Sequence, residues 1–353
     1  MLRSVLGALA ATAVMLGAAQ THAQTAWISR STNDVTRINT ATDVQIAGTT
    51  GGVSTPYGVL ATATRVYVAN FGGNTVTVLD AANSTFVATV TVGTQPFSLA
   101  LSPDGTRVYV SNRASDTVSV INTSTNTVVG SITAGTTPEG VAVSPDGATL
   151  YIANHGAHTV TARTIATNVL VQTYTTGLEP RQIVLSADGT KAYVTNYRNG
   201  SVSIITLASG GVPPTVSVGN SPWGITRSPD GSRIYVAHQQ SDSVSMISTA
   251  TNLVTATTGV GTNPLGVSTT PDGTKLYVTH QNSTFVSVLN AFTLATITTV
   301  DVGGAQLSVG QFIAAVPVVP AAVPTLSEWA IILFGLILAG GAALYIQRRQ
   351  LIA

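Results

Sequence analysis

Residues 138–177 read PEGVAVSPDGATLYIANHGAHTVTARTIATNVLVQTYTTG, and this stretch predicts four short strands joined by tight turns. The runs GVAV and TLYIAN flank residues 144–147, SPDG, in which the proline fixes φ and Asp-Gly suits the later positions of a turn. HTVTART and VLVQTYT follow, separated by a turn at residues 166–168. Short alternating strands bounded by turn residues are typical of an all-β fold.

The same pattern repeats along the chain. An aromatic residue recurs at intervals of 40 and then 42 residues, and a proline recurs with the same spacing. A period near 40 residues is the length of one four-stranded propeller blade, so seven aromatic positions predict a seven-bladed β-propeller. The aromatic positions are Trp27, Tyr67, Tyr109, Tyr151, Tyr193, Tyr235 and Tyr277, and the prolines are Pro56, Pro96, Pro138, Pro180, Pro222 and Pro264.

The two ends of the repeat region predict how the ring closes. Residues 25–54 match only the last three strands of a repeat, and residues 305–315 can supply one further first strand. One blade built from both ends closes the ring and hides its sheet edges. The sequence therefore predicts a single propeller domain over residues 24–315.

Two short motifs point to a known repeat family. The tetrapeptide YVTN at 193–196 has near copies at 67–70, 109–112 and 151–154. The turn SPDG stands at 102–105, 144–147 and 228–231, with SADG at 186–189 and TPDG at 270–273. These motifs resemble the YVTN-type β-propeller repeat family over roughly residues 25–315. The first full repeat departs from the pattern, because residues 61–64 lack the turn. YVTN-type propellers are similar to archaeal surface-layer proteins, so the resemblance implies a role at the cell surface.

Composition excludes several classes of function. The 353 residues carry a formal net charge of +1 and only 8% charged residues, without the clustered basic face that nucleic-acid binding needs. The chain has no cysteine, which excludes disulfides, thiol nucleophiles, iron–sulfur clusters and covalently attached haem. From this composition we expect that the protein has no cofactor and no nucleic-acid partner.

The first 23 residues are predicted to be a signal peptide. They combine one cation, Arg3, with an apolar run that ends at Ala23. This pattern is typical of a secretory signal cleaved after its last small residue, here Ala23. The apolar run is short for a membrane anchor, which is the alternative interpretation. The sequence therefore predicts export.

The C-terminal region is predicted to cross a membrane. Residues 330–346 form an unbroken apolar run between Trp329 and the pair Arg348 and Arg349. At 1.5 Å per residue this run is about 25 Å long, enough to cross a bilayer core as a helix. The tryptophan suits the outer interface and the arginines suit the cytoplasmic side. The predicted precursor is thus an inner-membrane protein whose propeller lies outside the cytoplasm.

A sorting motif precedes the apolar run. Residues 323–329, VPTLSEW, resemble the IPTL-type C-terminal sorting signal of Gram-negative bacteria, with Val323 in place of isoleucine. The resemblance implies cleavage near Pro324 by an exosortase-like membrane protease, and a permanent membrane anchor is the alternative. Residues 316–323 are predicted to be a proline-containing extended spacer, and residues 324–353 form the sorting region. The motif residues are Pro324, Thr325, Leu326, Ser327, Glu328 and Trp329.

Two repeat positions are expected to meet at one mouth of the propeller channel. One is the residue after each proline, and the other is the third residue after each aromatic. The residue type at the first position differs from repeat to repeat, whereas the residues around it recur. Such variation is expected of a ligand-binding surface, and an ordinary exposed rim is the alternative interpretation. The post-proline residues are Tyr57, Phe97, Glu139, Arg181, Trp223 and Leu265, and the second set is Arg30, Asn70, Asn112, Asn154, Asn196, His238 and His280. We take Tyr57, Phe97, Glu139, Arg181, Trp223, His238 and His280 as candidate binding residues for an unidentified surface or small-molecule ligand.

The histidines and aspartates have structural interpretations. His238 and His280 occupy the asparagine position of adjacent blades, so they either form a metal pair or replace asparagine in hydrogen bonds that hold a loop. Together with His155 and His158 they do not form an evident set of zinc ligands, so we predict no metal site. The recurring aspartates, 104, 146, 188, 230 and 272, are expected to hold turns on the opposite face.

No catalytic motif is present. The chain has no Gly-x-Ser-x-Gly elbow, and its repeats do not resemble the tryptophan-docking repeats of quinoprotein dehydrogenases. The sequence favours a non-enzymatic binding or structural module of the envelope or extracellular matrix. The alternative is a periplasmic or surface enzyme of the lactonase or lyase type that acts at the channel mouth.

Overall fold

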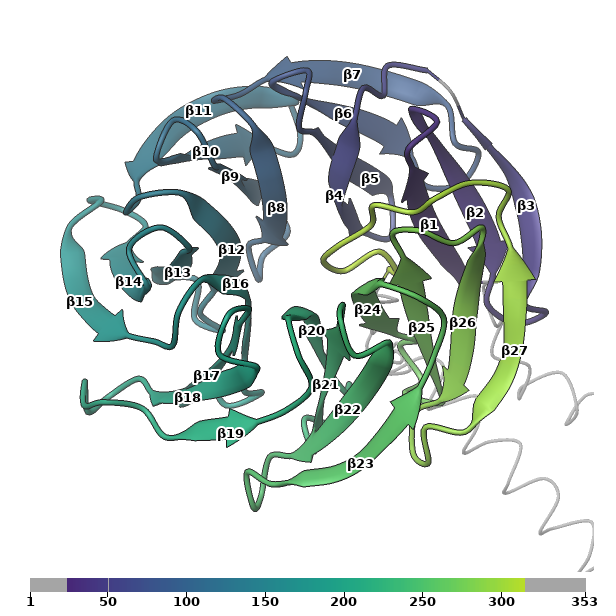
Figure 1. Cartoon of the computed structure of the whole chain (residues 1–353). Helices are drawn as coiled ribbons and strands as arrows, with labels where there is room; N and C mark the ends of the chain where they lie inside the picture. Colours follow the sequence, from purple (N-terminus) through teal and green to yellow (C-terminus); the bar gives the residue numbers. More distant parts are fainter. Residues whose placement is uncertain (1–23, 50, 315–353) are drawn as a thin grey trace, which may run out of the picture. The chain divides into compact units, whose positions relative to one another are not determined.

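The computed structural model describes residues 24–49 and 51–314. They form seven β-sheets around a central axis, one of three strands and six of four strands, as Figure 1 shows. The predicted all-β, seven-bladed propeller is therefore confirmed. The predicted signal peptide (1–23), spacer (316–323) and membrane span (330–346) lie outside the described residues. Within the described ranges, no helix has the length and apolarity needed to cross a membrane.

The strands fall into four types by their place in a blade. The innermost strands are β4 (Pro56–Ala61), β8 (Pro96–Leu101), β12 (Pro138–Val143), β16 (Pro180–Leu185), β20 (Pro222–Arg227) and β24 (Pro264–Thr269). The second strands are β1 (Thr25–Arg30), β5 (Arg65–Asn70), β9 (Arg107–Asn112), β13 (Thr149–Asn154), β17 (Lys191–Asn196), β21 (Arg233–His238) and β25 (Lys275–His280). Each innermost strand thus begins at one of the recurring prolines.

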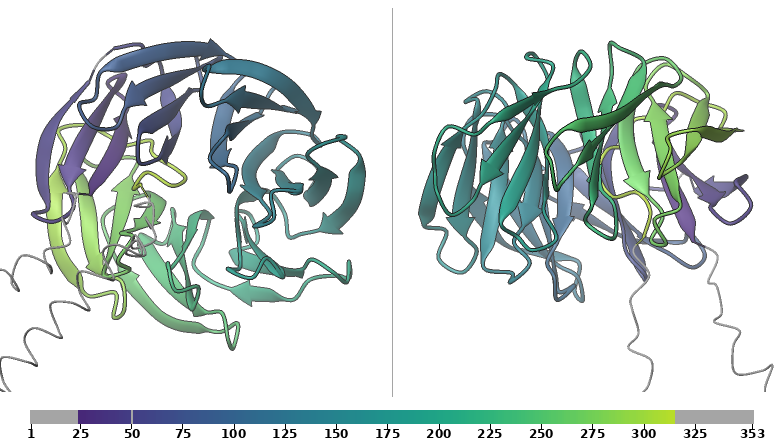
Figure 2. Two further views of the ribbon diagram at one scale, coloured as in Figure 1. Left: turned by 180° about the vertical axis from the view of Figure 1, so that it is seen from behind. Right: turned by 90° about the horizontal axis from the view of Figure 1, so that it is seen from below.

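The third and fourth strands complete each antiparallel sheet. The third strands are β2 (Asp34–Asn39), β6 (Thr75–Asp80), β10 (Thr117–Asn122), β14 (Thr159–Thr164), β18 (Ser201–Thr206), β22 (Ser243–Ser248) and β26 (Phe285–Asn290). The outermost strands are β3 (Val44–Thr49), β7 (Phe86–Thr91), β11 (Thr127–Thr133), β15 (Leu170–Thr175), β19 (Thr215–Ser217), β23 (Val254–Gly259) and β27 (Thr296–Asp301). Figure 2 shows the same arrangement of sheets from behind and from below.

The hydrophobic core lies between neighbouring blades. Tyr67 on β5 is 1% exposed and belongs to one cluster with Val108 and Val110 on β9 of the next blade. Large aromatic side chains remove more apolar area from water than any others, so one per blade supplies much of the inter-blade packing. The recurring aromatic that marks each repeat is thus a core residue.

The SPDG turns hold the ends of the innermost strands. Ser102 donates its hydroxyl to Asp104 Oδ1 at 2.6 Å, and the same oxygen accepts the backbone N–H of Thr106 at 3.0 Å. Gly105 adopts φ of +71°, which a residue without Cβ reaches at no steric cost. Hydrogen bonds from Ser186 and Thr190 lower the pKa of the equivalent Asp188 to about 2. These aspartates therefore act as acceptors that fix the turns.

Residues near the C-terminal end of the ring complete the three-stranded blade. The backbone N–H of Trp27 on β1 donates to the carbonyl of Phe312 at 2.9 Å, and Leu307 N–H donates to Ser29 at 3.0 Å. The segment 305–313 forms isolated bridges rather than a regular strand, and its Gly310 has φ of +91°. Because Val59 on β4 also donates to the carbonyl of Val309 at 3.0 Å, the segment bridges β1 and β4 (Figure 1).

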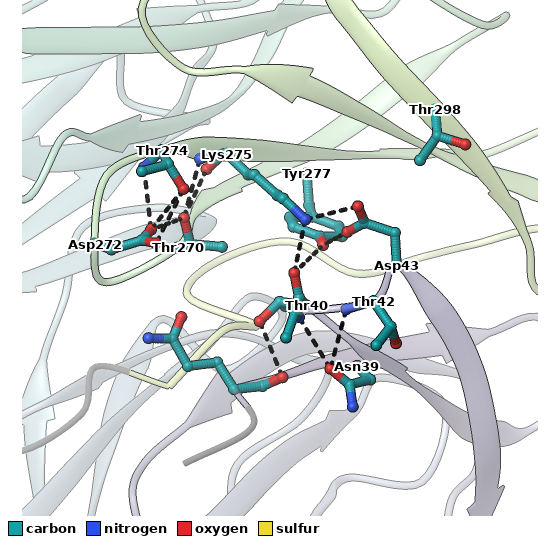
Figure 3. Close-up of polar contacts among 12 residues, drawn as sticks. Asn39, Thr40, Thr42, Asp43, Thr270, Asp272, Thr274, Lys275, Tyr277 and Thr298 are labelled. Atoms are coloured by element: carbon teal, nitrogen blue, oxygen red, sulfur yellow. Dashed lines mark hydrogen bonds and ion pairs between the residues drawn. The ribbon is translucent and has the colours of Figure 1, made fainter. Parts of the chain in front are cut away.

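A polar contact joins the N-terminal blade to the last blade, as Figure 3 shows. Asp43, in the turn between β2 and β3, accepts hydrogen bonds from Lys275 Nζ at 2.6 Å and from the Tyr277 hydroxyl on β25. Lys275 Nζ also donates to the carbonyl of Thr40 at 2.8 Å. Burial and the neighbouring carboxylate of Asp43 raise the pKa of Tyr277. We call this contact the closing seam, because it links residues 232 positions apart.

Candidate functional site

One face of the ring carries the predicted candidate residues. In each full blade the proline that begins the innermost strand pairs with the last residue of the second strand, as Pro96 does with Asn112. The SPDG turn lies at the opposite end of the same strand pair, beyond the Leu101–Val108 pairing. The loops before the innermost strands and after the second strands therefore open on one face, which we call the mouth face.

Aromatic side chains from several blades meet at this face. The rings of Tyr57 and Phe97 stack with centroids 4.9 Å apart, and Phe71 lies 5.6 Å from Tyr57. Phe97 is in one apolar cluster with Trp223, although β8 and β20 belong to blades that are not neighbours. That cluster also contains Leu265 and Val309, with Tyr57, Phe71 and Tyr197 packed against it. The predicted aromatic residues are thus brought together across the axis of the propeller.

A buried carboxylate and two arginines adjoin the aromatic cluster. Glu139 is fully buried and accepts hydrogen bonds from Arg181 Nη1 at 3.1 Å and from Arg113 Nε at 3.0 Å. The guanidinium of Arg181 also lies over the ring of Trp223, 3.9 Å from its centroid. Burial raises the pKa of Glu139, and the charges of the two arginines oppose this. With one carboxylate against two guanidinium groups, the cluster carries an excess positive charge.

Three buried donors beside this cluster lack a partner among the described residues. They are Nε of Arg181, Nε2 of Gln182 and Nε1 of Trp223. Gln182 and Trp223 are only 5% and 6% exposed. Buried N–H groups are normally paired, so these donors are candidates to bind an acceptor from outside the protein.

Three further residues beside these side chains come from a position outside the two predicted sets. This is the residue directly after the asparagine position, and it supplies Phe71, Arg113 and Tyr197 to the cluster. The residue type at this position differs between repeats as strongly as it does at the post-proline position, while the neighbouring residues recur. This difference is the signal in the sequence that could have identified the position. The full set is Ser31, Phe71, Arg113, His155, Tyr197, Gln239 and Gln281. We define the mouth cluster as Tyr57, Phe71, Phe97, Arg113, Glu139, Arg181, Tyr197 and Trp223.

The asparagine position itself points into the blades. Asn70 donates from Nδ2 to the hydroxyls of Thr75 and Thr77 on β6, at 2.9 and 2.8 Å. His238 and His280 are fully buried and make equivalent contacts, with Ser243 Oγ at 3.3 Å and Ser287 Oγ at 2.9 Å. The structure therefore does not bring these two histidines into the mouth cluster.

The other two histidines support loops on the mouth face. His158 Nδ1 accepts the backbone N–H of Glu179 at 3.1 Å, and His155 Nε2 lies 3.8 Å from Glu179 Oε2. Burial and the charge of Arg181 lower the pKa of His155 to about 4. Over residues 24–49 and 51–314, no three His, Cys, Asp or Glu side chains gather as metal ligands.

Replacing Glu139 with alanine should lower the free energy of unfolding by about 3–5 kcal/mol, because it leaves the largely buried Arg181 and the partly exposed Arg113 without their carboxylate. The control is Arg198→Ala, which breaks an ion pair with Glu179 in which the arginine side chain is 71% exposed. An exposed pair contributes about 0–1 kcal/mol. Urea denaturation measures both variants, and equal effects would contradict the central position of Glu139.

Solved structures share the propeller fold. Hydrazine synthase from Kuenenia stuttgartiensis is 24% identical, with a TM-score of 0.65 over 74% of this chain and 92% of that chain. A functionally unknown protein from Desulfotomaculum acetoxidans and a candidate 6-phosphogluconolactonase from Bacteroides fragilis are 19% and 18% identical. Both give a TM-score of 0.70 over 82% of this chain and 98% of their own. At these identities the likeness shows the fold alone.

Family models match two regions of the sequence. No curated protein was found that matches the chain. The IPTL-CTERM motif matches residues 321–350, so the sorting signal predicted from VPTLSEW is confirmed. The choice-of-anchor I domain matches residues 8–223, whereas the YVTN-type assignment stays an interpretation of the repeated tetrapeptides. Because that match covers more than half of the 353 residues, the chain belongs to the choice-of-anchor I domain family.

Proposed function

We propose that the protein is an exported, surface-displayed propeller that binds a ligand through its mouth cluster, without catalysing a reaction. The choice-of-anchor I domain and the C-terminal sorting signal point to an exported cell-surface protein. Among the described residues, the mouth cluster is the candidate site for contact with a ligand. Display places that site where extracellular molecules reach it.

The observation that carries the proposal is the set of unpaired donors in the mouth cluster. Arg181 donates from Nη1 to Glu139 and leaves its buried Nε without an acceptor among the described residues, and Nε1, the one polar atom of the Trp223 side chain, also has none. Tyr57 and Phe97 add a stacked pair of aromatic rings to the same cluster. The matching ligand has hydrogen-bond acceptors at one end and an apolar or aromatic face at the other, a combination typical of small-molecule sites.

Native mass spectrometry tests this binding. We expect the full-length protein, after incubation with culture medium of the producing cells, to retain a non-protein mass. Trp223→Phe keeps an aromatic ring and removes the Nε1 donor, so it should weaken retention roughly five- to tenfold. A protein that retains no mass, or a variant that retains as much as the wild type, would contradict the proposal.

The tail should be removed during sorting. The IPTL-CTERM motif is a sorting signal processed by a sorting protease; we propose that an exosortase-like enzyme cuts near Pro324 after the span 330–346 has held the precursor in the inner membrane. Mature protein should then lack roughly thirty residues, 324–353. The double variant Pro324→Ala and Glu328→Ala leaves the apolar span intact and should stay full-length in the membrane.

Mass spectrometry of the surface protein and of the membrane fraction reads out both forms. Leu333→Ala, within the apolar span, is the control and should be processed like the wild type. Mature protein that keeps residues 330–353, or normal processing of the double variant, would show that the tail is a permanent anchor.

The alternative is an enzyme of the lactonase or lyase type acting at the same mouth. A candidate 6-phosphogluconolactonase that is 18% identical shares the propeller fold with this chain. This likeness supports the alternative only through the fold, because a shared fold does not establish a shared activity. Hydrolysis of a δ-lactone by the purified protein, lost in Glu139→Gln, would favour this alternative over the binding module.

A further inference from the structure

A separate pocket of about 360 Å³ lies on the mouth face beside the mouth cluster. It is formed by the loops around β17 and β21, which belong to two neighbouring blades. Its walls include Glu179, Tyr197, Arg198, Asn199, Asn220 and Gln240. Tyr197 is the one residue that this pocket shares with the mouth cluster. The volume is at the small end of the range for ligand sites, about 300–1,000 Å³.

The aromatic wall of the pocket is held in place from outside it. The hydroxyl of Tyr197 donates to Gln239 Oε1 at 3.0 Å. The guanidinium of Arg181 lies over the ring at 4.5 Å from its centroid, and Trp223 meets the ring edge-to-face at 5.4 Å. Because these contacts already hold the ring of Tyr197, binding of a ligand against the ring costs little side-chain conformational entropy.

The charges that line the pocket cancel. Arg198 Nη1 lies 3.2 Å from Glu179 Oε1, so the one cation and the one anion of the wall form an ion pair. A wall without net charge offers no electrostatic advantage to an ionised ligand over a neutral one. The pocket therefore favours a neutral molecule.

The remaining walls are amides that are free to pair with a ligand. Asn199 Oδ1 accepts the backbone N–H of Leu178, which leaves its Nδ2 as a donor. Asn220 and Gln240 are exposed, and among the described residues their side chains have no hydrogen-bond partner. A free amide side chain provides both donors and an acceptor. Hydroxyl groups, which both donate and accept, match this arrangement.

We propose that this pocket binds a neutral pyranose sugar. A pyranose ring presents an apolar C–H face, which suits the fixed ring of Tyr197, and a rim of hydroxyls, which suits the amides of Asn199, Asn220 and Gln240. Its neutrality matches the paired charges of Glu179 and Arg198. The proposal is independent of ligand binding by the mouth cluster, since the two sites have different polar groups.

Saturation-transfer NMR and calorimetric titration of the full-length protein test the proposal. The probes are D-glucose, D-galactose and D-mannose, their methyl α- and β-glycosides, and D-glucuronate. At least one neutral sugar should bind with a Kd on the order of 1 mM, as expected for a ligand of this size. The variant Asn220→Ala with Gln240→Ala should weaken that binding about tenfold or more, because it removes two amides that contact only the ligand.

Asn282→Ala is the matched control, because Asn282 occupies the position of Gln240 in the next blade and is likewise exposed. It should bind like the wild type. Binding of a hexose but not of its methyl glycosides would assign the pocket to free sugars, and equal binding would assign it to sugar units of a glycan. The proposal is overturned if no neutral probe binds, if D-glucuronate binds most tightly, or if the double variant binds unchanged.

Discussion

A chain that lacks residues 25–54 should not unfold as one cooperative unit at the temperature of the intact protein. The deletion removes β1, β2 and β3, and with them the fully buried Trp27. It also leaves the segment 305–313 without the backbone partners on β1. Loss of a buried tryptophan side chain alone costs about 3–5 kcal/mol, a large share of the 5–15 kcal/mol that stabilises a typical domain. Thermal unfolding followed by circular dichroism measures the effect.

A single substitution at the closing seam tests ring closure without removing any strand. Asp43→Ala removes the carboxylate that pairs with Lys275 and Tyr277. Asn126→Ala is the matched control, since Asn126 lies at the same place in another hairpin turn and has the same φ of 54°. We expect the seam variant to lose about 3 kcal/mol more than the control, because it leaves the partly buried ammonium of Lys275 without its counter-ion. A deletion variant that melts like the intact protein would contradict closure by both ends.

Acidification from pH 7 to pH 4 should destabilise the protein through its two blade histidines. Burial lowers the pKa of both His238 and His280 to about 4, against 6.5 in an unfolded chain. Between these values the unfolded chain binds more protons than the folded one, so stability falls as the pH falls from about 6.5 towards 4. A shift of this size corresponds to about 3 kcal/mol for each histidine. His155, whose pKa is also lowered to about 4, adds to the same loss.

The double variant His238→Asn with His280→Asn tests this directly. Asparagine fills the same position in other blades, where Asn112 and Asn196 bond to hydroxyls on the third strand. The variant should therefore fold, and its urea midpoint should change much less between pH 7 and pH 4 than that of the wild type. An unchanged pH dependence would show that the two imidazoles do not control acid stability.

Much of the fold could be predicted because each blade repeats its own local signals. Proline at the start of β12, the SPDG turn and the aromatic of β13 recur in register, so periodicity alone predicted the strands and the number of blades. The segment 305–313 was harder to place, because backbone contacts to both β1 and β4 depend on how the ring closes. The closing seam shows the same limit: nothing local to Asp43 reveals a partner on β25.

The candidate site was predicted only in part. The post-proline position selected Phe97 and Trp223, which the structure places in one apolar cluster. The residue after the asparagine position was not predicted. The repeat pattern does not show which side chain faces the axis, that of the last residue of the second strand or that of the first residue of the loop. In the structure, His238 at the end of its strand is buried inside its blade, whereas Tyr197 at the start of its loop packs against the mouth cluster.

A crystal structure of the protein with the molecule that it retains from culture medium tests whether the mouth cluster binds a ligand. We expect ligand density against Tyr57, Phe97 or Trp223, with an acceptor atom within hydrogen-bond distance of Arg181 Nε or Trp223 Nε1. Ligand density on the opposite face, beside the SPDG turns, would contradict it.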